Sequence, residues 1–136
     1  MQNQERKEID TSETRNRLWA ELTSHIGEAN AIGMAALYQA VYDRPWNNRI
    51  NDTRALRILV TTLREEGKPI CSVATSTGGG YYLAAAGSEL ALYLRRSERR
   101  ALLILKRNAK MKQISLPNYL GQIKLGMEDV GDDKAA

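Results

Sequence analysis

Residues 51–84, NDTRALRILVTTLREEGKPICSVATSTGGGYYLA, constrain the fold more than any other stretch of this chain. Asn51 and Asp52 are residues of the type that caps a helix, because their side chains accept hydrogen bonds from the free N–H groups of a first turn. The apolar residues that follow recur at helical spacing and form one stripe: Leu56, Leu59, Val60 and Leu63. Gly67 and Pro69 predict the end of this helix.

Two short strands are predicted directly after this helix. Residues 70–73 and 81–85 have strand-like composition, and the small, glycine-rich segment 74–80 between them predicts a flexible turn. On the helix itself, the face opposite the apolar stripe carries Arg54, Arg57, Thr61 and the aliphatic Ile58. The sequence therefore predicts an arginine-faced helix followed by a glycine-tipped β-hairpin.

The segment RALRILVTTLREEGKPICS…GGGYYLA resembles the recognition helix and wing of winged helix-turn-helix proteins from bacterial regulators and phages. The Leu-Arg-x-x-Gly-x-Pro-Ile run and the Gly-Gly-Tyr-Tyr-Leu ending carry this resemblance, which covers roughly residues 32–86. It implies an α+β fold, mainly α with a small β-hairpin: a winged helix-turn-helix with an extra long C-terminal helix. The same fold also serves as a protein-contact module. The segment 43–51 between the two helices departs from the family, whose turn has about 3–4 residues.

The flanking regions extend this plan. Residues 1–11 are polar and predict a disordered N-terminus, and residues 12–112 form the predicted winged helix domain with its long C-terminal helix. Its first helix is predicted to run from Ser12, as cap, to Ile26, with Gly27 ending it. A second helix is predicted from about Gly33 to Tyr42. Residues 113–136 form a tail that we expect to be partly packed and then acidic and disordered.

The long helix is predicted from Gly87 to about Lys112, roughly 37 Å at 1.5 Å per residue. Its main apolar stripe comprises Leu90, Tyr93, Leu94, Ala101, Ile104 and Leu105. Leu92 and Leu103 lie off this stripe between arginines, and a second apolar strip favours a second packing partner. We therefore expect a homodimer through this helix. The basic residues of segment 95–112, eight against one acid, form a solvated face or a surface that contacts DNA backbone.

Composition excludes several classes of protein. A length of 136 residues predicts one domain, and 43% apolar with 26% charged residues is ordinary for a soluble protein. The single cysteine, Cys71, excludes an internal disulfide and suits a reducing cytosol, so a cytoplasmic location without membrane association is expected. One histidine, His25, and one cysteine are too few for a zinc site, and we expect no metal and no cofactor. His25 is interpreted as a half-buried structural residue.

The residues expected to contact double-stranded DNA lie on the third helix, before it and on the wing. Arg54 and Arg57 are predicted to reach base edges, because an arginine fork pairs with guanine O6 and N7. Ile58 is assigned to a thymine methyl. The remaining predicted contacts, to phosphate or base, are Arg49, Thr53, Thr61, Arg64, Lys68, Thr75, Ser76, Thr77 and Gly78.

Two other segments allow two interpretations each. The connection around Arg44, Asn47, Asn48 and Arg49 either contacts phosphates or is a solvated loop pinned by Trp46 and Ile50. In the tail, Gln122, Leu125 and Met127 resemble the short motif by which bacterial proteins bind the replication sliding clamp, although Gly126 stands where the motif has a large apolar residue. Alternatively, the apolar residues of the tail pack back on the domain.

No enzyme signature is present: the chain lacks a nucleophile elbow, a Cys–His pair and clustered carboxylates. Three functions remain open. The chain is a small DNA-binding transcriptional regulator, a phage or mobile-element replication accessory protein that binds an origin and recruits machinery through its tail, or a protein–protein interaction module.

Overall fold

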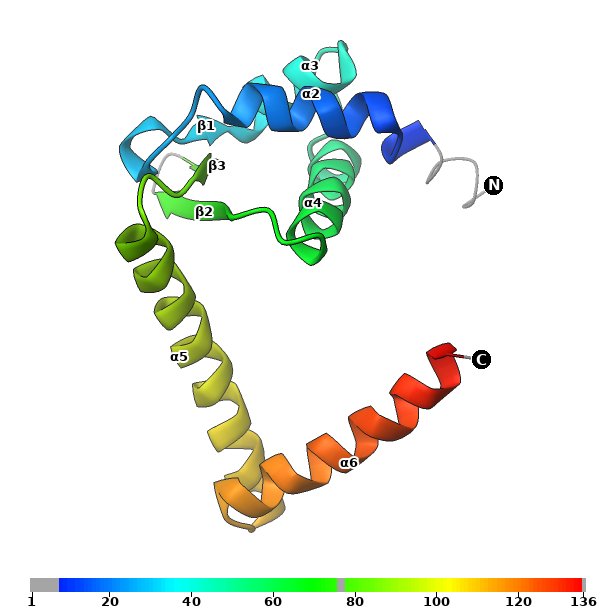
Figure 1. The fold of residues 1–136 in the computed structure, drawn as a ribbon, viewed down its shortest axis with the longest axis vertical. Coiled ribbons are helices and arrows are strands. Elements are labelled where there is room, and N and C mark those ends of the chain that lie inside the picture. Colours follow the sequence, from blue (N-terminus) through cyan, green and yellow to red (C-terminus); the bar gives the residue numbers. More distant parts are fainter. Residues whose placement is uncertain (1–7, 76–77, 136) are drawn as a thin grey trace. The chain divides into compact units, whose positions relative to one another are not determined.

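The computed structural model describes residues 8–75 and 78–135 (Figure 1). The elements follow in the order α2 (Ser12–Leu22), the 3-10 turn η1 (Glu28–Asn30), β1 (Ile32–Gly33), α3 (Met34–Tyr42), α4 (Arg49–Glu65), β2 (Ile70–Thr75), β3 (Gly78–Leu83), α5 (Gly87–Lys112) and α6 (Leu116–Ala135). The chain divides into two compact units, one up to Ala91 and one from Leu92 onward. It is mainly helical with a small three-stranded antiparallel sheet, which confirms the α+β prediction.

One hydrophobic core joins α2, α3, α4 and the sheet in the first unit. The apolar stripe predicted on α4 lies in this core: its leucines and valine, at positions 56, 59, 60 and 63, are at most 3% exposed. Leu18 and Leu22 of α2 and Leu37 and Val41 of α3 are fully buried against them. Helical spacing therefore identified the core residues of α4 correctly.

Helix α2 begins and ends earlier than predicted. Its N-cap is Thr11, not Ser12: the Thr11 hydroxyl accepts from the Thr14 backbone N–H at 3.1 Å, while Thr14 Oγ1 accepts from the Thr11 N–H at 2.9 Å. The helix ends at Leu22, not Ile26. The chain beyond it pairs with the end of β3, since the carbonyl of His25 accepts from the Leu83 N–H and the Gly27 N–H donates to the Leu83 carbonyl.

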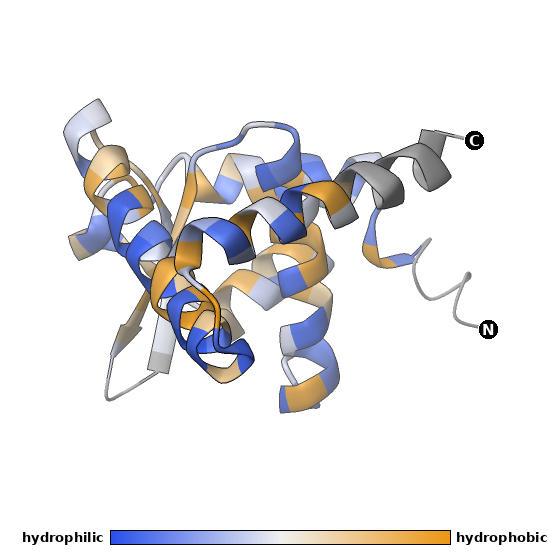
Figure 2. Cartoon of the chain, turned by 90° about the horizontal axis from the view of Figure 1, so that it is seen from below, coloured by the Kyte–Doolittle hydropathy of each residue, from blue (hydrophilic) through white to orange (hydrophobic). Residues whose placement is uncertain are grey.

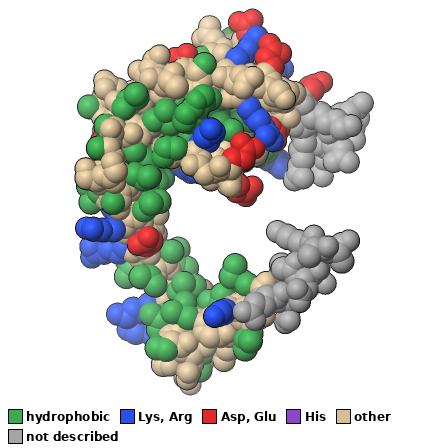
Figure 3. All heavy atoms as spheres, viewed as in Figure 1, with side chains coloured by type: hydrophobic (Ala, Val, Ile, Leu, Met, Phe, Trp, Pro, Cys, Tyr) green, Lys and Arg blue, Asp and Glu red, His purple; other side chains and the backbone are tan. Residues whose placement is uncertain are grey.

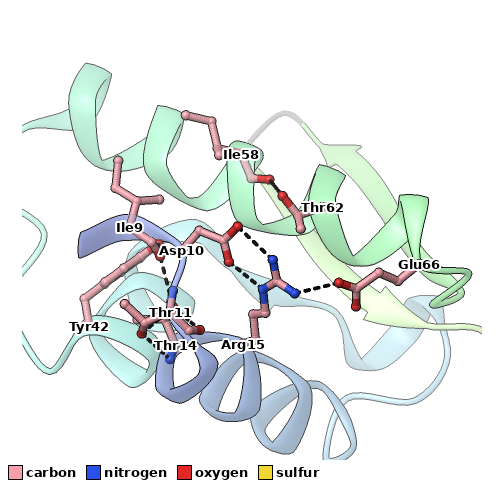
Figure 4. Close-up of polar contacts among 9 residues, drawn as sticks. All are labelled: Ile9, Asp10, Thr11, Thr14, Arg15, Tyr42, Ile58, Thr62 and Glu66. Carbon is pink, nitrogen blue, oxygen red and sulfur yellow. Dashed lines mark hydrogen bonds and ion pairs between the residues drawn. The ribbon is translucent and has the colours of Figure 1, made fainter. Parts of the chain in front are cut away.

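Residues 8–11, which the sequence placed in a disordered segment, are attached to the core of the first unit; residues 1–7 lie outside the described part (Figure 4). The Tyr42 hydroxyl donates to the Ile9 carbonyl at 3.1 Å, and Ile9 packs against the core. The Arg15 guanidinium binds both carboxylate oxygens of Asp10 and also reaches Glu66 at 2.6 Å. Arg15 thereby connects the start of the chain to the C-terminal end of α4.

We expect Asp10→Asn to lower the free energy of unfolding at pH 7 by about 0.5–1 kcal/mol, because the ion pair with Arg15 is lost. The hydrogen bond from Arg15 lowers the pKa of Asp10 below its ordinary value of 3.8, although partial burial opposes this. A lowered folded-state pKa contributes stability above the unfolded pKa, which is lost as pH falls through the folded one. The difference between wild type and variant should therefore shrink below about pH 4.

Urea unfolding at several pH values measures this difference. Glu13→Gln is the matched control, since Glu13 pairs with Arg17 at 2.7 Å on the same helix but is 73% exposed. It should change stability by about 0.5 kcal/mol or less. An Asp10→Asn effect that is the same at pH 2 and pH 7 would contradict the assignment to the ion pair.

Helix α4 begins at Arg49, two residues before the predicted capping pair. Asn48 is the N-cap: its side-chain oxygen accepts from the backbone N–H groups of Ile50 and Asn51, each at 3.1 Å. The prediction that Asn51 and Asp52 cap this helix is therefore wrong: the Asn51 N–H is itself capped by Asn48, and the Asp52 carboxylate accepts from the N–H groups of Asn47 and Asn48, which precede the helix. The connection after α3 is therefore shorter than the sequence indicated.

The predicted end of α4 at Gly67 is confirmed. Gly67 has φ +93°, the left-handed conformation that glycine adopts without cost. Its N–H donates to the Arg64 carbonyl, and the Lys68 N–H donates to the Leu63 carbonyl. This pair of bonds is the Schellman motif that satisfies the last carbonyls of a helix.

The sheet has the strand order β1-β3-β2, and its first strand was not predicted. β1 pairs with β3 in the register Ile32↔Tyr81 and Gly33↔Gly80. β2 and β3 are longer toward the turn than expected, so the glycines of the predicted flexible tip form part of β3. A Cβ atom on Gly80 would lie 2.5 Å from the Ile32 carbonyl oxygen, so this glycine permits the close approach of β1.

Helix α5 has the predicted bounds, and the segment after it forms helix α6, where the sequence predicted a partly packed and then disordered tail. Ile114, Leu116 and Tyr119 of this segment are half-buried. Gln113, at φ +61°, reverses the chain, and the N–H groups of Gln113 and Ile114 close the end of α5 in the same way as at Gly67. Ser115 then caps α6 by accepting from the Asn118 N–H at 3.3 Å. Pro117 does not interrupt α6 because it lies in the first turn, where helical N–H groups need no intrahelical partner.

Candidate nucleic-acid interface

The exposed face of α4 carries the residues predicted to read DNA. Arg54, Arg57 and Thr61 are exposed, as is Arg49 at the helix start, whereas Ile58 and Thr53 are half-buried. Within the described part of the chain, the side chains of Arg49, Arg54 and Arg57 make no hydrogen bond, ion pair or ring contact. Their guanidinium groups therefore remain available to an external ligand.

Arg64 and Lys68, also predicted to contact DNA backbone, have contacts inside the protein. Arg64 Nε donates to the Ile70 carbonyl at 2.7 Å, and its guanidinium lies 5.8 Å from the centre of the Tyr81 ring. The Lys68 ammonium lies 4.6 Å from the centre of the Trp19 ring. Both cations thus help to attach the end of α4 to neighbouring parts of the first unit, a role that sequence spacing does not reveal.

A polar cleft of about 390 Å³ opens beside α4. The residues that line it include Tyr38, Tyr42, Arg44, Asn51, Asp52 and Arg54. Burial raises the pKa of Tyr38, and the nearby Asp52 carboxylate raises it further while Arg44 opposes this. Burial likewise raises the pKa of Tyr42, whose ring lies 4.8 Å from that of Tyr38 and 5.9 Å from the Arg44 guanidinium. These tyrosines stay neutral across the physiological range and serve as hydrogen-bonding and packing groups.

Trp46 and Ile50 were expected to anchor the connection before α4, and only Trp46 does so. Trp46 packs against the core, although its indole N–H is buried without a partner among the described residues. Ile50 is 80% exposed, so the interpretation of Ile50 as a buried pin is wrong. The reason is the earlier start of α4, which places Ile50 in the first helical turn and on the outer face.

The predicted wing contacts are only partly described. Thr75 is exposed at the end of β2, and Gly78 pairs with it as the first residue of β3. Ser76 and Thr77 lie outside the described residues. The three-residue tail motif lies within α6, where Gln122 Oε1 accepts from the Lys112 ammonium at 2.7 Å. Leu125 and Met127 are 66% and 69% exposed.

The second unit exposes much apolar surface along its helices. On α5, Leu94 is 46% and Ile104 is 55% exposed, and Met111 near the helix end is 78% exposed. Lys and Arg side chains gather along one side of α5, with hydrophobic side chains beside them (Figure 3). Apolar and hydrophilic residues also alternate along the coloured first part of α6, the helix that leads to the C-terminus (Figure 2). Where α5 meets α6, Ala109 is buried.

Cys71 and His25, the side chains that could support redox, acid–base or metal chemistry, lie in environments that indicate a structural role. Cys71 is fully buried, and burial raises the pKa of its thiol. His25 Nδ1 donates to the Asn30 carbonyl at 2.8 Å, as expected for a half-buried structural histidine. Among the residues whose side chains the structure describes, 8–75 and 79–127, no three His, Cys, Asp or Glu side chains gather as a metal site would require. In the same ranges, no helix has the length and apolar character needed to span a bilayer.

Comparisons with known protein families, curated proteins and solved structures find no match to this chain. The function of this chain is therefore inferred from the geometry of α4 and its surroundings.

Proposed function

We propose that this protein binds double-stranded DNA as a winged helix-turn-helix, with α4 in the major groove, and acts as a small transcriptional regulator. One observation carries the proposal: Arg54 and Arg57 are exposed on α4, and neither has a partner in the described part of the chain. A helix that follows a supporting helix, α3, and precedes a hairpin is where such a fold presents its reading residues. Unpaired arginines on that face suit guanine edges and phosphates.

Binding of the purified protein to a random-sequence duplex at several salt concentrations tests the proposal. Fluorescence anisotropy should give a dissociation constant of roughly 10⁻⁴–10⁻⁶ M near physiological salt. Because phosphate contacts release counterions, the logarithm of the association constant should fall linearly with the logarithm of salt concentration. Absence of binding at low salt would contradict DNA binding and leave the protein–protein interaction module as the better explanation.

The exposed Leu125 and Met127 support the alternative of a replication accessory protein that recruits machinery through its tail. In that role, α4 would bind an origin, and the segment from Gln122 to Met127 would contact the sliding clamp. Helical structure around Gln122 argues against an immediately available extended motif, since the segment would have to leave α6 to bind in extended form. We therefore place this function second.

We further propose that the protein is a homodimer through the exposed apolar stripe of α5. Leu94→Glu/Ile104→Glu should convert the dimer to a monomer, because the glutamates would have to be desolvated in the interface. Sedimentation equilibrium of both proteins measures the change. Arg95→Gln/Lys106→Gln, which alters a different face of α5, is the control and should remain dimeric. A monomeric wild type at micromolar concentration would contradict the dimer.

A further inference from the structure

The start of α4 at Arg49 adds a residue to the face that carries the two free arginines. Ile50, Arg54, Arg57 and Thr61 stand at i, i+4, i+7 and i+11. At about 100° per residue these four side chains fall within roughly 60° of one another around the helix axis. Ile50 is thus the first member of an exposed row that continues through both arginines.

The fold itself makes little use of an isoleucine at this position. Ile50 is 80% exposed, more than any other large hydrophobic residue described, whereas burying such a side chain would contribute about 1.5–3 kcal/mol. Its branched Cβ also favours strands over helices. Its backbone is nevertheless held in place, because the Ile50 N–H donates to the Asn48 cap at 3.1 Å. The side chain is therefore an apolar group presented to the outside from a fixed point.

A single exposed isoleucine needs no explanation on most surfaces. Here its neighbours along the helix are two unpaired arginines, and the N-terminal residues of a recognition helix are those that reach base edges. The major groove offers one apolar group for such a side chain, the C5-methyl group of thymine. Ile58, the residue that the sequence assigned to this methyl group, is half-buried and lines the cleft beside α4.

We propose that Ile50 is a specificity-determining residue that contacts the C5-methyl group of a thymine in the major groove, beside the bases contacted by Arg54 and Arg57. This inference rests on the proposed DNA binding by α4. Four residues of helix span about 6 Å, and successive bases are about 3.4 Å apart. The thymine should therefore lie within about two base pairs of the base that Arg54 contacts.

Removal of the methyl group from DNA tests the contact at the level of single atoms. Duplexes bound by the wild type are selected from a random pool, and each thymine of the recovered site is replaced in turn by deoxyuridine. Wild type should bind about fourfold more weakly when one particular thymine loses its methyl group, the loss expected for one apolar carbon. Ile50→Ala should bind the thymine and deoxyuridine duplexes equally at that position.

Ile58→Ala is the matched control, with the same chemical change at a half-buried position of α4 that lines the cleft. It should retain the wild-type preference for thymine over deoxyuridine, and thermal melting should show that both variants are folded. Two results would overturn the role of Ile50 but leave DNA binding intact. The first is wild-type binding that no deoxyuridine substitution weakens. The second is a preference for thymine that disappears in Ile58→Ala and persists in Ile50→Ala. Failure of the wild type to bind any duplex overturns both.

Discussion

Gly80→Ala is expected to lower the free energy of unfolding by about 3 kcal/mol, at the upper end of the range for overpacking. The added methyl group would lie 2.5 Å from the carbonyl oxygen and 3.0 Å from the carbonyl carbon of Ile32. Both atoms belong to the backbone of β1, so no side-chain rotation can relieve the contact. The two strands would have to separate at the pair Gly33↔Gly80. Urea unfolding followed by circular dichroism measures the loss.

Gly33→Ala is the control, because Gly33 is the register partner of Gly80 in the same pair of strands. A Cβ atom on Gly33 would meet no atom within 4 Å, and its φ of −67° suits any residue. We expect a change of about 0.5 kcal/mol or less. Equal effects at the two glycines would show that the close approach of β1 to β3 does not determine the stability of the first unit.

The same glycine shows why the sheet was only partly predictable from the sequence. A cluster of glycines indicates a turn when only local conformation is considered, yet Gly80 serves a strand that needs room for a neighbour. That neighbour, β1, has two residues and no periodic pattern of its own, so it exists only through its pairing with β3. Helices α3, α4 and α5 were predictable because their apolar residues recur at helical spacing over at least two turns.

The candidate site was predictable to a similar extent. Spacing identified the outward face of α4 and therefore Arg54 and Arg57. It could not show that Arg64 bonds to the Ile70 carbonyl or that Lys68 lies over Trp19, since both contacts depend on tertiary structure. The N-cap was also misplaced by three residues, at Asn51 in place of Asn48, because Asn48, Asn51 and Asp52 are all good capping residues. This small difference moved Ile50 from the interior of a loop to the exposed row.

Arg54→Ala/Arg57→Ala is expected to weaken binding to double-stranded DNA by at least about tenfold, and more on a selected site than on random sequence. Each arginine that contacts a guanine edge contributes about 1–3 kcal/mol of discrimination, which random sequence does not reveal. Removal of an arginine that contacts a phosphate lowers the affinity for all sequences alike and reduces the salt slope by about 1. Anisotropy titrations of wild type and variant, on both duplexes and at several salt concentrations, separate the two kinds of contact.

The control must remove the same charge from other surfaces, because lower net charge alone weakens attraction to DNA. Arg17→Ala/Lys124→Ala meets this requirement: Arg17 pairs with Glu13 on α2, and Lys124 is exposed on α6. If α4 reads DNA, the control should retain nearly all of the wild-type affinity and the full preference for the selected site. Equal losses in both double variants would mean that affinity depends on overall charge. The outward face of α4 would then have no special part in binding, and the basic residues of α5 would be the next surface to substitute.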